Sequence, residues 1–159
     1  AFSLLNPHLR HNLKVVITGR KGISYDIYIY RASELGISDD VIFTDFIPLD
    51  DLPIFYNACE FLVYPSFYEG FGLPPIEAMA CGTPVIASNV TSLPEVCCNS
   101  ALLVDPNDID ELSLSMEKVL SDSLLKLSMI QKGLSTSLKY TWKNTAINTI
   151  KAYESIINF

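Results

Sequence analysis

Long hydrophobic runs and a clustered basic face are both missing from this chain. Its unbroken apolar stretches are only a few residues long, far below the roughly 18 residues that a membrane-spanning helix needs. No basic, apolar and small-residue leader opens the sequence, so we expect a cytoplasmic protein. The 11 Lys and Arg residues are scattered among 18 Asp and Glu, with a net charge of -7, which argues against a nucleic-acid partner.

Cysteine is scarce and follows neither a metal-ligand nor a disulfide spacing. The four cysteines are Cys59, Cys81, Cys97 and Cys98, and none forms a CxxC pair. The adjacent Cys97 and Cys98 cannot bridge each other without strain. We therefore expect reduced cysteines that serve in packing, and we predict no cofactor and no metal site.

The chain does contain short apolar runs that alternate with amphipathic segments. Its 159 residues, 49% of them hydrophobic, are enough for one domain with a substantial core. Expected strands are 13–19, 41–46, 61–66, 84–88 and 101–104, and expected helices between them are 25–35, 52–58 and 75–80. The alternation is typical of a parallel sheet whose strands are buried on both faces.

After Asp105 and Pro106 the pattern predicts helices only. Asp108 or Asp110 can cap one helix, Ser123 can cap the next, and Asp50 and Asp51 are cap candidates for the helix at 52–58. Residues 142–159 form a last helix with an apolar stripe, in which we expect Trp142 to lie in the core. The whole chain, 1–159, is predicted to be a single domain, with 107–159 as its C-terminal helices.

The segment at 64–88, YPSFYEGFGLPPIEAMACGTPVIAS, predicts a strand, a loop and a helix that starts near Pro75. The loop then lies at the carboxyl edge of a parallel sheet, where open α/β sheets bind ligands. A helix N-terminus offers N–H groups and a positive dipole to a phosphate. Gly70 and Gly72 let a ligand approach the backbone and accept from the amides around Gly72 and Leu73.

Two glutamates flank this loop. Glu69 lies on the loop and Glu77 is expected in the first helical turn. Ionised carboxylates accept from vicinal hydroxyls, so one glutamate can bind a hexose and the other a ribose, with a diphosphate between them. This predicts a nucleotide sugar. Alternatively, the segment is a glycine-proline turn, in which Glu69 is solvated and Glu77 complements the helix dipole.

EGFGLPPIEAMACGTPVIAS, followed by SLPEV at 92–96, resembles the signature of the group 1, or family four, retaining glycosyltransferases of GT-B fold. Five further segments follow the order of that family's C-terminal domain: KVVITG, LGISDDVIFTDFIP and DLPIFYNACEFLVYPS upstream, and ALLVDPND and YTWKNTA downstream. The resemblance implies a Rossmann-like three-layer α/β/α fold with a parallel sheet, one half of a GT-B fold, and an all-helical C-terminal tail.

The resemblance also implies roles for the loop residues. Glu69 contacts the transferred sugar and is the candidate catalytic residue. Backbone amides at Gly70, Phe71, Gly72 and Leu73 contact sugar and phosphate, and Glu77 binds the ribose hydroxyls.

Two further groups follow from the same resemblance. The base is expected against the backbone of Asp45, Phe46 and Ile47. The family's diphosphate-binding Arg and Lys follow the first strand of the domain, which this sequence lacks. Arg20 and Lys21 imitate that pair after the next strand, as possible phosphate ligands or as a solvated basic turn.

The chain starts at Ala1, and we expect it to be a piece of a longer protein. This piece is expected to lack the N-terminal acceptor domain and the central first strand. Loss of that strand should leave two unpaired sheet edges. The fragment alone should be inactive. In intact enzymes of the family the last helix crosses onto the N-terminal domain, so its apolar stripe is expected here to be exposed or to form a crystal or dimer contact. In the intact protein we expect a glycan or lipid-linked acceptor, peripheral membrane contact, and work at the inner face of the membrane. The alternatives are a non-catalytic nucleotide-sugar-binding module with a partner chain, and a related GT-B epimerase or phosphorylase.

Overall fold

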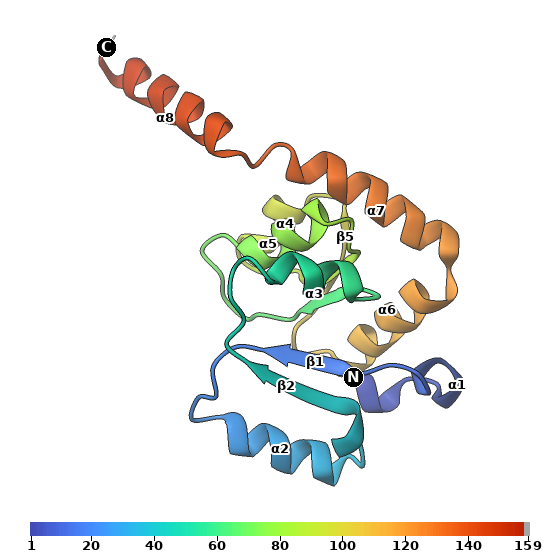
Figure 1. Ribbon diagram of the computed structural model, residues 1–159. Helices are drawn as coiled ribbons and strands as arrows, with labels where there is room; N and C mark the ends of the chain where they lie inside the picture. Colours follow the sequence, from blue (N-terminus) through green and yellow to red (C-terminus); the bar gives the residue numbers. More distant parts are fainter. Residues whose placement is uncertain (158–159) are drawn as a thin grey trace.

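The computed structural model describes residues 1–157, and its strands lie in two parallel sheets (Figure 1). In the first sheet β1 (Val15–Thr18) pairs with β2 (Val41–Asp45), with Val15 opposite Val41. In the second sheet β4 (Val85–Ser88) lies between β3 (Leu62–Tyr64) and β5 (Ala101–Val104). All five predicted strands are present, although most are shorter than the apolar runs that predicted them.

Helices occupy the segments between and after the strands. Their bounds are α1 (Pro7–Arg10), α2 (Tyr25–Glu34), α3 (Leu52–Ala58), α4 (Leu73–Ala80), α5 (Leu93–Cys97), α6 (Ile109–Ser121), α7 (Ser123–Ser137) and α8 (Trp142–Ile157), with short 3-10 turns at Phe2–Leu4 and Ser38–Asp40. Within residues 1–157, none of these helices combines the length and apolar composition that crossing a membrane requires.

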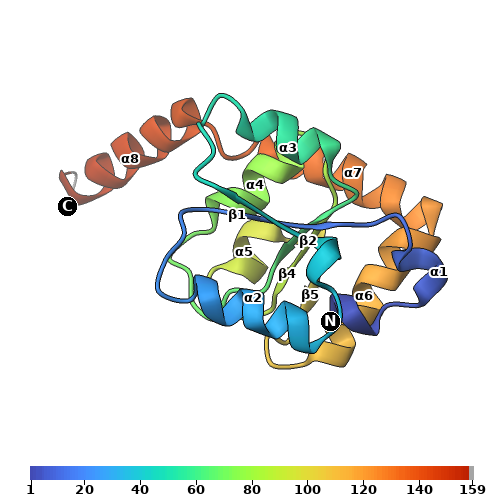
Figure 2. The same ribbon diagram turned by 60° about the horizontal axis from the view of Figure 1, so that its bottom comes forward.

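The core is built around β4, whose four residues are all buried. Val85 and Ala87 pack with apolar residues of α4 and α5, whereas Ile86 packs on the opposite face with residues of α6. Figure 2 shows this sheet between α4 and α5 on one side and α6 on the other. The second sheet therefore has the predicted three-layer α/β/α arrangement.

The first sheet is covered much less. Val16 and Ile17 of β1 and Ile42 of β2 are exposed, so the prediction of strands buried on both faces is wrong for these two. Among the described residues β1 pairs only with β2 and β3 only with β4, which leaves one unpaired edge on each. The predicted break in the sheet is confirmed.

Helix starts confirm one cap assignment and correct two. Asp108 caps α6 as expected, with its carboxylate accepting from the Glu111 amide at 2.8 Å. Asp122, not Ser123, caps α7 and accepts from the Leu125 amide. The extended backbone of Asp122 ends α6 and begins α7, so Ser123 is already helical. Asp51 precedes α3, but no side-chain cap bond forms there.

The last helix, α8, extends away from the rest of the molecule (Figure 1). Trp142 is 90% exposed, so its predicted core position is wrong; the sequence pattern shows an apolar stripe but no packing partner for it. Ile150 and Tyr153 of the same stripe are also exposed. The predicted helix continued to residue 159, and residues 158–159 lie outside the described part.

All four cysteines are free thiols, as predicted. Cys97 is fully buried, and its burial raises the pKa of that thiol to about 11. Cys59 and Cys98 are exposed, which corrects the packing role expected for them, since each lies just beyond the last residue of a short helix, α3 or α5. Among residues 1–157, no three His, Cys, Asp or Glu side chains lie close enough together to hold a metal ion.

Candidate functional site

The loop between β3 and α4 turns into the helix at Gly72. This residue has φ of +100°, and a Cβ atom placed on it would lie 2.6 Å from Cδ2 of Leu93. The helix begins at Leu73, two residues earlier than predicted, so Glu77 lies in its second turn rather than its first. Because the helix dipole acts mainly within the first turn, complementing that dipole no longer accounts well for Glu77.

Two prolines limit the amide donors at this helix start. The first three residues of a helix have no intrahelical partner for their N–H groups. In α4 these are Leu73, Pro74 and Pro75, and proline has no N–H. The donors that remain for a ligand are the amides of Leu73 and of Gly72 before it, which are the positions that the sequence predicts.

Residues that follow β4 hold the loop backbone in place. The amide of Glu69 donates to Thr91 Oγ1 at 3.2 Å. Ser92 Oγ lies 2.9 Å from the carbonyl oxygen of Glu69 and 3.0 Å from that of Phe71, and it donates to both. Thr91 itself has φ of +56°, an uncommon conformation for a threonine. The loop carrying Glu69 is therefore tied to the next crossover of the sheet at three points.

Each predicted glutamate accepts a hydrogen bond from a tyrosine, and we call Tyr56, Tyr64, Glu69 and Glu77 the tyrosine–glutamate cluster. Tyr64 Oη donates to Glu69 Oε1 at 2.6 Å, and Tyr56 Oη donates to Glu77 Oε2 at 2.9 Å. All four residues are half-buried. Burial, followed by the hydrogen bond and charge of Glu69 and the charge of Glu77, raises the pKa of Tyr64 to about 12.

The pKa of Tyr56 is raised too, first by burial and then by its hydrogen bond to Glu77 and that carboxylate's charge. The charge of Tyr64 contributes to this shift, and that of Glu77 contributes to the shift at Tyr64. The two tyrosine–glutamate pairs are thus close enough to influence each other. The arrangement presents two carboxylates beside free backbone amides, which suits a ligand with hydroxyl groups and a phosphate.

The predicted base and phosphate residues come together at the end of the first sheet. Asp45 has φ of +63°, and its carboxylate accepts from the Phe46 amide at 2.8 Å. The Arg20 guanidinium lies 5.4 Å from the centre of the Phe46 ring, and Lys21 Nζ lies 4.9 Å from the centre of the Tyr25 ring. Ile47, the third predicted base residue, is buried.

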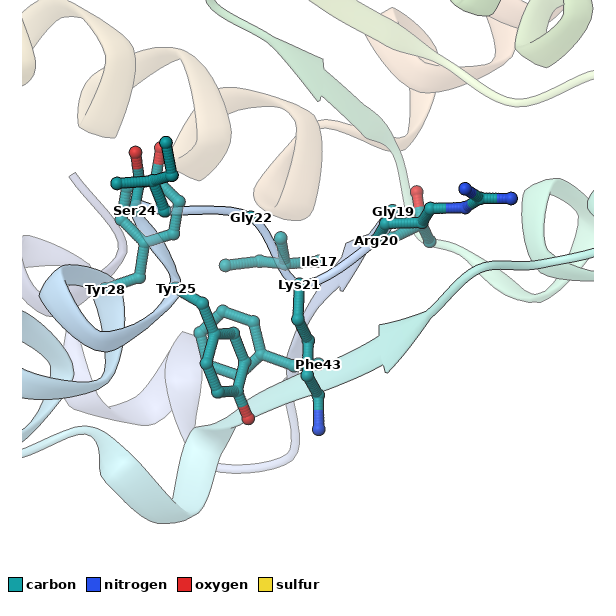
Figure 3. Close-up of a pocket in the computed structure, with 11 residues that line it drawn as sticks. Ile17, Gly19, Arg20, Lys21, Gly22, Ser24, Tyr25, Tyr28 and Phe43 are labelled. Atoms are coloured by element: carbon teal, nitrogen blue, oxygen red, sulfur yellow. The ribbon is translucent and has the colours of Figure 1, made fainter.

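A hollow at the carboxyl end of β1 is lined by residues 17–25, Tyr28 and Phe43. Figure 3 shows the Arg20 and Lys21 side chains extending in different directions from its rim. Glu69 and Glu77 are not among its lining residues. The predicted residues therefore form two groups, one at the end of each sheet.

Sequence reasoning missed the residues that support the glutamates. Tyr64 lies five residues before Glu69, and that short separation was a usable signal. Thr91 and Ser92 lie more than twenty residues from Glu69 and Phe71, whose backbone they hold. The SLPEV segment that begins at Ser92 belongs to the family signature, but its local pattern does not show which residues Ser92 contacts.

Comparison with known proteins decides the family. Residues 1–136 match the family described as Glycosyl transferases group 1. The chain belongs to this family. Over 155 residues it is 39% identical to O-antigen chain mannosyltransferase B of Escherichia coli, a match that covers 97% of this chain and 40% of that relative. The chain thus spans well under half of the relative's length.

Solved structures agree on the fold of this group 1 chain. It superposes on sucrose-phosphate synthase from Thermosynechococcus elongatus with a TM-score of 0.83 and 28% identity, over 99% of this chain and 42% of that one. It also superposes on Anabaena HepE, solved in complex with UDP-glucose, with a TM-score of 0.79 and 21% identity, over 99% of this chain and 43% of that one. These matches show the Rossmann-like half of a GT-B fold.

Proposed function

We propose that this chain is the donor-binding domain of a retaining glycosyltransferase, which moves a hexose from a nucleoside-diphosphate sugar to a glycan or glycolipid acceptor. The observation that carries the proposal is the pair Glu69 and Glu77 on either side of the free amides of Gly72 and Leu73. Glu69 binds the hexose, Glu77 binds the ribose, and the amides bind the diphosphate between them.

Transfer requires stabilisation of the leaving diphosphate. Negative charge develops on its oxygens as the bond to the sugar breaks, and amides that already point at this position stabilise that charge. The loop amides of Gly70 and Phe71 are proposed to assist those of Gly72 and Leu73. Arg20 is a further candidate, although its stacking on Phe46 would have to change for it to reach a phosphate.

The relatives support a particular donor class and pathway. A named O-antigen mannosyltransferase is 39% identical, which favours mannose as the hexose and a cell-surface polysaccharide as the product. A neighbour of the same fold was solved with UDP-glucose, which supports a nucleotide sugar as the donor class. Binding of a glycan or lipid-linked acceptor at the inner face of the membrane is assigned to parts of the protein outside these residues.

Titration of the protein in its full natural length against UDP-, GDP- and ADP-sugars tests the proposal. We expect Glu77→Ala to weaken nucleotide binding by about 1.5–3 kcal/mol, because hydrogen bonds to a charged acceptor are lost. Glu34→Ala is the matched control, since Glu34 is exposed on α2 and pairs with Arg31 of the same helix at 3.0 Å. Unchanged nucleotide affinity in Glu77→Ala would contradict the ribose assignment.

Transfer itself separates the two candidate classes. An active transferase should lose sugar transfer when Glu69 is changed to Ala, while nucleoside diphosphate still binds. A full-length protein that binds a nucleotide sugar, yet transfers nothing to a glycan or lipid-linked acceptor, would support the non-catalytic binding module instead.

A further inference from the structure

The proposed function gives no task to the two tyrosine hydroxyls of the tyrosine–glutamate cluster. We infer that Tyr64 and Tyr56 are positioning residues, which hold the carboxylates of Glu69 and Glu77 in the orientations that bind the hexose and the ribose. This inference rests on the proposed function and assigns the supports of the same site.

Tyr64 is well placed to orient a loop side chain. It is the last residue of β3, and its ring packs against the apolar cluster around β4 and α4. Its hydroxyl reaches out of this packed region to Glu69 at 2.6 Å. Since Thr91 and Ser92 already hold the Glu69 backbone, the tyrosine restrains the remaining freedom, that of the side chain. A carboxylate restrained in this way loses less conformational entropy when a ligand binds.

Tyr56 is anchored at both ends. Its backbone carbonyl accepts from the Thr83 hydroxyl at 2.7 Å, just after α4, and its ring packs against the same apolar cluster as Tyr64. Its hydroxyl donates to Glu77 within α4. The residue thus connects α3 to the middle of α4 through its hydroxyl and to the segment after α4 through its backbone carbonyl. Its side chain fixes the Glu77 carboxylate relative to the helix start that carries the free amides.

The direction of these hydrogen bonds selects a kind of ligand group. A tyrosine hydroxyl is protonated at neutral pH, and burial raises both pKa values further, so both hydroxyls donate. Each occupies one oxygen of its glutamate and leaves the other, Oε2 of Glu69 and Oε1 of Glu77, to accept from a ligand. An oriented acceptor fits the hydroxyls of a hexose or ribose and repels a phosphate.

Tyrosine-to-phenylalanine variants test the inference, because they remove only the hydroxyl and keep the packed ring. The full-length protein is titrated with UDP, GDP, UDP-glucose and GDP-mannose. Tyr64→Phe should weaken binding of the preferred nucleotide sugar about tenfold and leave the affinity for its nucleoside diphosphate within about twofold of wild type. Tyr56→Phe should weaken both by about tenfold, because both contain the ribose.

Tyr140→Phe is the matched control. Tyr140 is half-buried against the same apolar cluster, its hydroxyl donates to the backbone carbonyl of Val96 at 3.2 Å, and the ring that contacts Phe71 is retained. Loss of the Tyr140 hydroxyl should lower thermal stability without changing the ratio of the affinities for the nucleotide sugar and its nucleoside diphosphate. A second check uses Glu69→Gln, in which adding Tyr64→Phe should cause little further loss of nucleotide-sugar affinity.

The outcomes separate this inference from the proposed function. Wild-type protein that binds a nucleotide sugar, with Tyr64→Phe and Tyr56→Phe binding equally well, would overturn the positioning roles alone. A proportional loss for all ligands in Tyr64→Phe would do the same, because it indicates a general structural role. Wild-type protein that binds none of the UDP-, GDP- and ADP-sugars of the first titration would overturn the proposed function and the inference with it.

Discussion

Gly72 is the residue on which the loop geometry depends most directly. It combines φ of +100° with a close approach to Leu93, so a side chain there is both strained and obstructed. We expect Gly72→Ala to lower the free energy of unfolding by about 2–3 kcal/mol, measured by urea denaturation. Gly70→Ala is the control, since a Cβ at Gly70 meets nothing within 4 Å, and equal losses would contradict this account.

Candidate site residues on one short stretch of chain could be predicted, and supporting residues that meet this stretch from a distance could not. Glu69 and Glu77 were predicted as candidates because both flank a single loop. The hydroxyl groups of Thr91 and Ser92 reach that loop only because β3 and β4 are neighbours in the sheet. Their contribution depends on tertiary geometry, which the local pattern does not contain.

At the scale of elements, two helix starts differ in whether an aspartate side chain caps them. Asp122 accepts from the Leu125 amide at 2.9 Å, whereas Asp51 makes no side-chain cap bond at the start of α3. We therefore expect Asp122→Ala to lower the free energy of unfolding by about 1 kcal/mol, measured by thermal denaturation. Asp51→Ala should change it by no more than a few tenths of that, and the reverse order would show that the caps are misassigned.

Element order and type were predictable because apolar runs and helical stripes depend on periodicity alone. Whether an element is buried could not be predicted from periodicity. The same kind of apolar run gives fully buried β4 and largely exposed β1. The stripe of α8 is exposed, as the resemblance predicted, although the pattern alone placed Trp142 in the core. An apolar face identifies the side of an element that can be buried, and that side is buried only where another element packs against it.

At the scale of the whole molecule, the two sheets should differ in local stability. β4 is buried and paired on both sides, whereas β1 is exposed and has one unpaired edge. Hydrogen exchange of the 159-residue chain should therefore show strongly protected amides in β4 and faster exchange throughout β1 and β2. Equal protection in both sheets would indicate that the first sheet is stabilised by contacts not seen in this structure.

The position of Trp142 determines what tryptophan fluorescence can show about this molecule. It is the only tryptophan in the sequence, and it stands almost fully exposed at the start of a helix that extends away from the core. Unfolding of the core should therefore change tryptophan emission very little, and the tyrosine signals are needed to follow it. The same residue is a built-in fluorophore for α8, whose docking onto any other surface would shift its emission to the blue.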